Sequence, residues 1–109
     1  MTREEIAEIN PDAILYDGLD EAIIGIAERL TMNTVVAYDK DKTIEILMRD
    51  MTVEDSELPE LESMGMSVED RKYEMAMEHF DYNILGGWLG ENTPIFVTLN
   101  AYEQEEQEG

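Results

Sequence analysis

The sequence predicts an α+β fold: a small antiparallel sheet of three to four strands packed against two main helices plus a short N-terminal helix. Short runs of β-branched residues predict the strands, and apolar residues recur at helical spacing in two longer segments. The chain has 109 residues, 43% of them hydrophobic, which is the size and apolar content of one globular domain. We therefore expect a single domain over residues 1–102 and an acidic mobile tail over residues 103–109.

The short N-terminal helix is expected over residues 3–9. Thr2 and Glu5 have the spacing of a capping box, and Ile6 and Ile9 would share one helix face. Pro11 follows closely and would stop the helix. The segment should therefore form about two helical turns.

Two interpretations compete for the next apolar runs, residues 14–17 and 22–28. They form either a hairpin that turns at Asp17-Gly18-Leu19-Asp20 or a strand followed by a helix. The hairpin is favoured because the second run is rich in isoleucine and because Gly25 would weaken a helix interior. Whether residues 19–30 are strand or helix stays open at this point.

A further strand is expected over residues 34–38, followed by the first main helix. Asp39 can cap this helix. The residues that recur at helical spacing and predict its buried stripe are Ile44, Leu47, Met48 and Met51. The next segment, residues 52–66, is acidic and contains a proline, and it predicts an exposed insertion without regular structure.

Ser67 and Asp70 have the spacing of a second capping box and predict the start of the other main helix. The residues expected on its apolar face are Tyr73, Ala76, Met77, Phe80 and Ile84. Gly86-Gly87 would end the helix, after which Leu85 and Trp88 should pack inward on the core. Gly90 then allows a turn, and Pro94 should lead into a final strand over residues 95–99.

Charge is the strongest indication of function. The net charge is −20, from 27 acidic and 7 basic side chains, and residues 51–109 alone carry 15 acidic and 2 basic side chains. Such a chain is repelled by nucleic acid and by anionic membrane surfaces, so we expect direct binding to neither. A partner that binds through charge must present a basic surface.

Cysteine is absent, which excludes disulfides, thiol nucleophiles and cysteine-ligated metal sites. The N-terminal sequence MTREEIAEIN lacks the features of a signal peptide, and no apolar stretch approaches the roughly 20 residues that span a bilayer. We expect a cytoplasmic protein with no cofactor.

The stretches YDGLDEAIIGIAER, VVAYDKDKTIEILMRD and HFDYNILGGWLGENTPIF together resemble a family of small, functionally uncharacterised acidic proteins from bacteriophages and bacteria. The shared pattern is DG-x-D-x-A-x-x-G, then YD-x-x-K, then FN-x-x-G-x-x-x-G-x-x-TP-x-F. The matching positions are Asp17, Gly18, Asp20, Ala22, Gly25, Tyr38, Asp39, Lys42, Asn83, Gly86, Gly90, Thr93, Pro94 and Phe96. Tyr82 stands where the family usually has Phe. The resemblance covers residues 13–98 and implies a phage-type accessory protein, but it carries over no catalytic residues.

An enzyme is the competing interpretation. Asp17, Asp20 and Glu21, with Asp39, could bind a divalent cation or act in acid–base catalysis if they converge in a partly buried site. Turn formation explains these aspartates more simply. A calcium loop starting at Asp39 fails because Ile44 occupies the position that needs glycine, and the lone His79 has no partner for a transition-metal site.

The leading hypothesis is a non-enzymatic binding protein that occupies the basic surface of a nucleic-acid-binding host or defence protein, as an inhibitor or DNA mimic. The residues expected to bind this partner are Glu54, Asp55, Glu57, Glu60, Glu62, Glu69, Asp70, Glu74, Glu78 and Asp81. An acidic structural domain whose charge only keeps it solvated is a further alternative, and the sequence leaves a homo-oligomer open.

Overall fold

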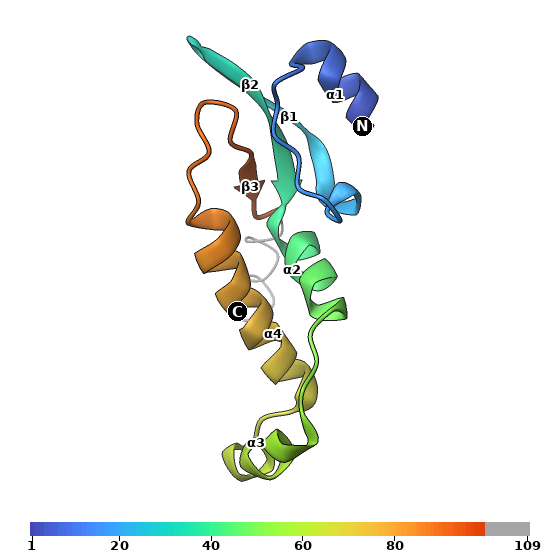
Figure 1. The fold of residues 1–109 in the computed structure, drawn as a ribbon, viewed down its shortest axis with the longest axis vertical. Helices are drawn as coiled ribbons and strands as arrows, with labels where there is room; N and C mark the ends of the chain where they lie inside the picture. The colour runs from blue at the N-terminus through green and yellow to red at the C-terminus, as the bar shows by residue number, and fades with distance from the viewer. Residues whose placement is uncertain (100–109) are drawn as a thin grey trace, which may run out of the picture. The chain divides into compact units, whose positions relative to one another are not determined.

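The computed structural model describes residues 1–99, and the expected acidic tail at 103–109 lies outside them. The helices and strands of the described chain confirm an α+β fold (Figure 1). In chain order they are α1 (Arg3–Ile9), η1 (Asp20–Ala22), β1 (Ile23–Arg29), β2 (Met32–Asp39), α2 (Lys40–Arg49), η2 (Asp55–Glu57), α3 (Leu58–Met64), α4 (Val68–His79), η3 (Phe80–Leu85) and β3 (Ile95–Val97). They fall into two compact units, residues 1–43 with 88–99 and residues 44–87. The single domain expected over residues 1–102 stays a prediction.

The sheet of the first unit is mixed, so the expectation of an antiparallel sheet is wrong. Its strand order is β1-β2-β3, with β1 antiparallel to β2 and β3 parallel to β2. Ala37 of β2 pairs with Ile95 of β3. Parallel neighbours need a long crossover connection, which the helices between β2 and β3 supply. The strand after Pro94 is confirmed, although it ends at Val97.

The hairpin turns later than predicted. Residues 23–29 and 32–39 form its two strands, which settles residues 23–29 as strand rather than helix. The turn lies at Leu30-Thr31, where Thr31 has φ 64°, a conformation that β-branched residues rarely adopt. The strand expected at 14–17 is absent from the described chain. The turn at Gly18, with φ 84°, leads into η1 and not into a strand that could pair with residues 14–17.

The capping box of α1 is confirmed. The Glu5 N–H donates to Thr2 Oγ1 at 3.2 Å, and the Thr2 N–H donates to Glu5 Oε1 at 3.0 Å. This geometry satisfies two amides at the helix start and lowers the pKa of the Glu5 carboxyl through its hydrogen bonds to Thr2. The helix buries Ile6, which is 1% exposed.

Three aromatic rings pack together in the first unit. The Tyr38 and Phe96 rings stack with centroids 5.5 Å apart, and the Tyr16 ring lies 5.8 Å from that of Tyr38 and 6.0 Å from that of Phe96. Tyr38 is fully buried. These contacts fix the segment before the sheet against β2 and β3.

Asp39 caps α2 as predicted, because its Oδ1 accepts a hydrogen bond from the Lys42 N–H at 3.2 Å. The predicted buried stripe is confirmed only in part. Ile44 is buried, but Leu47, Met48 and Met51 are half-buried. The sequence pattern missed Ile46, which is 8% exposed.

The acidic segment at 52–66 is largely helical, so the expectation of an irregular insertion is wrong. It forms η2 and α3, with Pro59 in the first turn of α3, where a proline costs no hydrogen bond. Leu61 is 6% exposed and gives the segment a buried anchor. Gly65 ends α3 in the left-handed conformation, with φ 70°.

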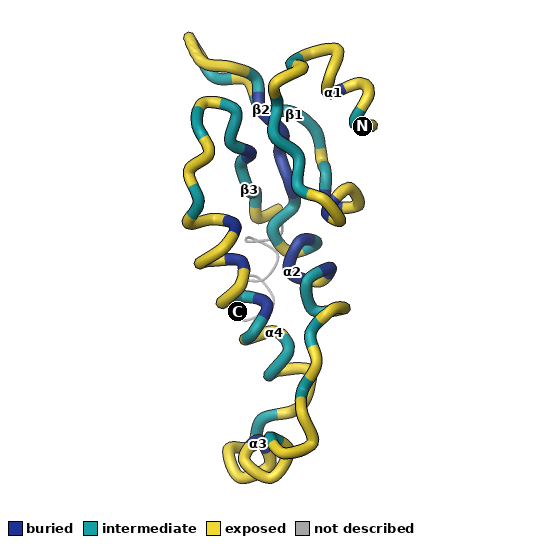
Figure 2. The backbone as a smooth tube through the Cα atoms, viewed as in Figure 1, coloured by how far each residue is buried: buried dark blue, intermediate teal, exposed yellow. Residues whose placement is uncertain are grey.

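The second predicted capping box is also confirmed, and α4 continues into the π-helix η3. Figure 2 shows the buried residues along this helix, which are Ala76, Phe80 and Ile84. Met77 is half-buried, whereas Tyr73, expected on the same face, is 52% exposed.

The chain after this helix differs from the prediction. Leu85 and Trp88 are 56% and 68% exposed, so the inward packing expected of them is wrong. Because Ile84 points inward, Leu85 is rotated away from the buried face by about one quarter of a turn. Trp88 then lies in an irregular stretch that turns at Gly90, where φ is 96° as the turn expected there requires.

Candidate functional site

All ten carboxylates predicted to bind a partner lie in the second unit, residues 44–87, on η2, α3, α4, η3 and the residue before η2. Nine of them are exposed and Glu57 is half-buried (Figure 2). This unit carries twelve acidic and three basic side chains. We call the ten residues the acidic surface.

Helix geometry explains why η2 and α3 expose their acids. Leu61 is buried, and its neighbours Glu60 and Glu62 are each rotated away from it by roughly 100° and face solvent. At the start of the segment, the Glu54 N–H donates to Glu57 Oε2 at 3.1 Å. Glu57 therefore stabilises the start of η2 as well as contributing charge.

Five members of the acidic surface have structural partners. The Asp70 carboxylate caps α4 by accepting from the Ser67 N–H at 3.3 Å. Arg71 forms ion pairs with Glu57 at 3.6 Å and with Glu74 at 3.1 Å. Lys72 lies 4.0 Å from Glu69, and the side chains of Glu54 and Glu57 form the capping box at the start of η2.

The other five members have side chains without a hydrogen bond or ion pair in the part of the chain that the structure describes. They are Asp55, Glu60, Glu62, Glu78 and Asp81. Carboxylates that are solvated and unpaired can bind a cation without first breaking an internal interaction. These five are therefore the best placed to meet a basic partner.

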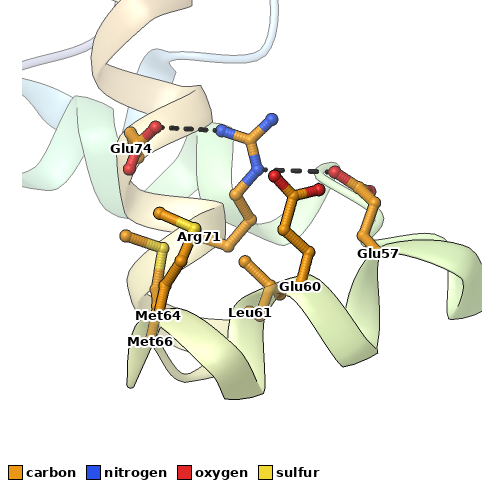
Figure 3. Close-up of a pocket in the computed structure, with 7 residues that line it drawn as sticks. All are labelled: Glu57, Glu60, Leu61, Met64, Met66, Arg71 and Glu74. Atoms are coloured by element: carbon orange, nitrogen blue, oxygen red, sulfur yellow. Dashed lines mark hydrogen bonds and ion pairs between the residues drawn. The ribbon is translucent and has the colours of Figure 1, made fainter.

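A pocket of about 220 Å³ lies at the junction of η2, α3 and the start of α4. Its lining residues are Glu57, Glu60, Leu61, Met64, Met66, Arg71 and Glu74. Figure 3 shows Glu57 and Glu74 reaching Arg71 from different elements, with Glu60 beside the guanidinium and the two methionines on the other side of it. The sequence contains no signal for this pocket, because neither the burial of Leu61 nor the ion pairs of Arg71 follow from a distinctive local pattern.

The carboxylates of the enzyme alternative have a different arrangement. Arg3 Nε donates to both carboxylate oxygens of Asp20, at 3.0 and 2.8 Å, and Arg3 lies 3.5 Å from Asp17. The hydrogen bond from Arg3 lowers the pKa of Asp20. Asp39 is engaged in capping α2.

Glu21 is exposed, and residues 1–99 contain no group of three or more acids and histidines placed to hold a metal ion. His79 lies on α4, where its Nδ1 is 3.3 Å from the Asn83 side-chain nitrogen.

The described helices include none that is long and apolar enough to cross a membrane.

Comparisons with protein-family models, with curated proteins and with solved structures find no match to this chain.

Proposed function

We propose that this protein is a non-enzymatic acidic binding protein that occupies the basic surface of a nucleic-acid-binding protein. It would act as an accessory protein in the cytoplasm, in competition with nucleic acid. The observation that carries the proposal is the set of five exposed carboxylates that have no partner among residues 1–99, within a unit that has twelve acidic and three basic side chains.

Electrostatics supports a partner of this class. A dense negative surface attracts a groove that binds phosphates, speeds association with it and disfavours acidic partners. The attraction acts over about 10 Å at 0.1 M salt and weakens as salt rises. Basic nucleic-acid-binding surfaces are the partners for which this charge is the most complementary.

The arrangement around Arg3 gives the enzyme alternative no specific support. A divalent cation would need both Asp17 and Asp20. Arg3 already compensates the negative charge of Asp20 and lies close to Asp17. We therefore keep binding as the proposed function.

Affinity capture from a bacterial lysate tests the proposal when it is paired with two charge variants. The first variant neutralises the five unpaired acids of the acidic surface: Asp55→Asn, Glu60→Gln, Glu62→Gln, Glu78→Gln and Asp81→Asn. The matched control neutralises five exposed acids of the other unit: Glu8→Gln, Asp12→Asn, Glu28→Gln, Asp41→Asn and Glu91→Gln. Both variants lose the same charge, so only the location of the charge differs.

We expect the wild-type protein and the control to retain basic nucleic-acid-binding proteins at about 50 mM salt and to release them by about 500 mM salt. The first variant should release them at a lower salt concentration. Equal retention by both variants, or retention that ignores salt, would contradict the proposal.

A further inference from the structure

The pocket between α3 and α4 combines apolar walls with carboxylates. Leu61, Met64 and Met66 supply the apolar walls, and the unbranched methionine side chains adapt readily to an incoming group. Met64 is 63% exposed, so this wall is open to solvent. An exposed thioether beside a buried leucine offers a partner side chain an apolar contact.

The charged part of the lining is not balanced. Three carboxylates, Glu57, Glu60 and Glu74, surround one guanidinium, that of Arg71, which leaves a net charge of −2. Arg71 is already paired with Glu57 and Glu74. Glu60 lines the same pocket and has no described partner, so it is available for a second cation.

We propose that this pocket receives one arginine side chain of the basic partner. The aliphatic stem lies against Met64, Met66 and Leu61, and the guanidinium donates to Glu60 and to the outer oxygens of Glu57 or Glu74. The inference rests on the proposed function and adds the residue type and the position of one contact.

Arginine fits this lining better than lysine. Its planar guanidinium has five N–H donors and can bond to two carboxylates at once, and it is more weakly hydrated than an ammonium group. It therefore loses less hydration in a pocket whose walls are partly apolar. A second copy of this chain is a poor occupant, because each copy carries a net charge of −20.

The test is a titration of the intact protein with fluorescein-labelled hexa-arginine, followed by anisotropy at low salt. Glu60→Gln removes the free carboxylate of the pocket and should weaken binding by about tenfold, as expected for a charge-assisted hydrogen bond. Glu8→Gln is the matched control, because Glu8 is also an exposed helical glutamate without a described partner, and it belongs neither to the acidic surface nor to the pocket. It should weaken binding by less than about twofold.

Two further measurements report on the pocket itself. In NMR spectra of protein with ¹³C-labelled methionine methyl groups, hexa-arginine should shift the signals of Met64 and Met66 but not that of Met32, which lies in β2. Hexalysine should bind more weakly than hexa-arginine and shift the Met64 and Met66 signals less.

The inference is wrong if Glu60→Gln and Glu8→Gln weaken the binding of hexa-arginine equally, if the two methionine signals do not move, or if hexalysine binds as tightly as hexa-arginine. In those cases salt-dependent binding of both peptides would leave the proposed function standing. Binding of neither peptide at low salt would contradict the proposed function as well.

Discussion

The hydroxyl of Tyr38, in β2, accepts a hydrogen bond from the backbone N–H of Tyr16 at 2.9 Å. Tyr38 is fully buried, and burial raises the pKa of its phenol, which keeps the hydroxyl neutral. Residues 14–17 thus reach β2 through a side chain instead of through the backbone ladder of a strand. A short apolar run in the sequence does not distinguish these two arrangements.

Tyr38→Phe should lower the free energy of unfolding by about 1–3 kcal/mol, because it leaves the half-buried Tyr16 N–H without its acceptor. Urea denaturation followed by circular dichroism measures the change. Tyr73→Phe, which removes a hydroxyl from a side chain that is 52% exposed, is the control and should have little effect. Equal stability of Tyr38→Phe and wild type would show that this hydrogen bond contributes nothing.

Trp88→Ala should change the free energy of unfolding by less than about 0.5 kcal/mol, because the side chain is 68% exposed. Phe80→Ala should cost about 3–5 kcal/mol, because Phe80 is fully buried and its truncation leaves a cavity. Circular dichroism is the suitable probe, since it does not depend on the tryptophan. A cost for Trp88→Ala close to that for Phe80→Ala would mean that Trp88 packs inward after all.

Gly86→Ala and Gly87→Ala should have opposite effects on stability. A Cβ at Gly86 would lie 2.8 Å from the Asp81 carbonyl oxygen, which is backbone and cannot easily move, so we expect a cost of about 1–3 kcal/mol. A Cβ at Gly87 meets nothing closer than 3.8 Å, and alanine there should stabilise the protein by about 0.4–1 kcal/mol. Thermal melting of both variants checks the signs, and two effects of the same sign would refute the geometry at the end of η3.

Asp20→Asn should lower the melting temperature at neutral pH by breaking the ion pair with Arg3. The pKa of Asp20 is lowered from its ordinary value of 3.8, so the folded state binds fewer protons than the unfolded state in that region. The stabilisation is therefore complete above pH 3.8 and is lost as the pH falls through the lower folded value.

The melting temperatures of wild type and Asp20→Asn should therefore converge as the pH is lowered below about 4. Asp12→Asn is the matched control, because it removes an exposed carboxylate of the same unit without breaking a described ion pair. Removing any one negative charge from a chain of net charge −20 reduces repulsion and so raises the melting temperature, and Asp12→Asn measures this general effect. A difference between wild type and Asp20→Asn that stays constant across this pH range would show that the ion pair contributes nothing.

Local signals in the sequence predicted the helix starts well. Both capping boxes and the Asp39 cap involve residues three positions apart, so the sequence contains the whole interaction. The hairpin turn was misplaced because Leu30-Thr31 lacks the glycine or asparagine that usually marks such turns. The parallel pairing of β3 depends on contacts between distant residues, for which the sequence has no local signal.

The acidic surface could be predicted in position but not in detail. Exposure follows directly from charge, whereas the division into paired and unpaired carboxylates depends on where Arg71 and Lys72 point. Trp88 was expected to pack inward because large apolar residues tend to be buried. In an irregular segment after a helix, a single large apolar residue can stay exposed, as Trp88 does.

Displacement of nucleic acid from a captured partner tests the central claim most directly. Fluorescence anisotropy of a labelled DNA duplex bound to that partner is followed while this protein is added. Wild type and the control with five neutralised acids in the first unit should release the duplex and so lower the anisotropy. The variant in which the five unpaired acids of the acidic surface are neutralised should release much less of the duplex. If the anisotropy rises because a ternary complex forms, or if both variants release the duplex equally, the acidic surface does not compete for the nucleic-acid site.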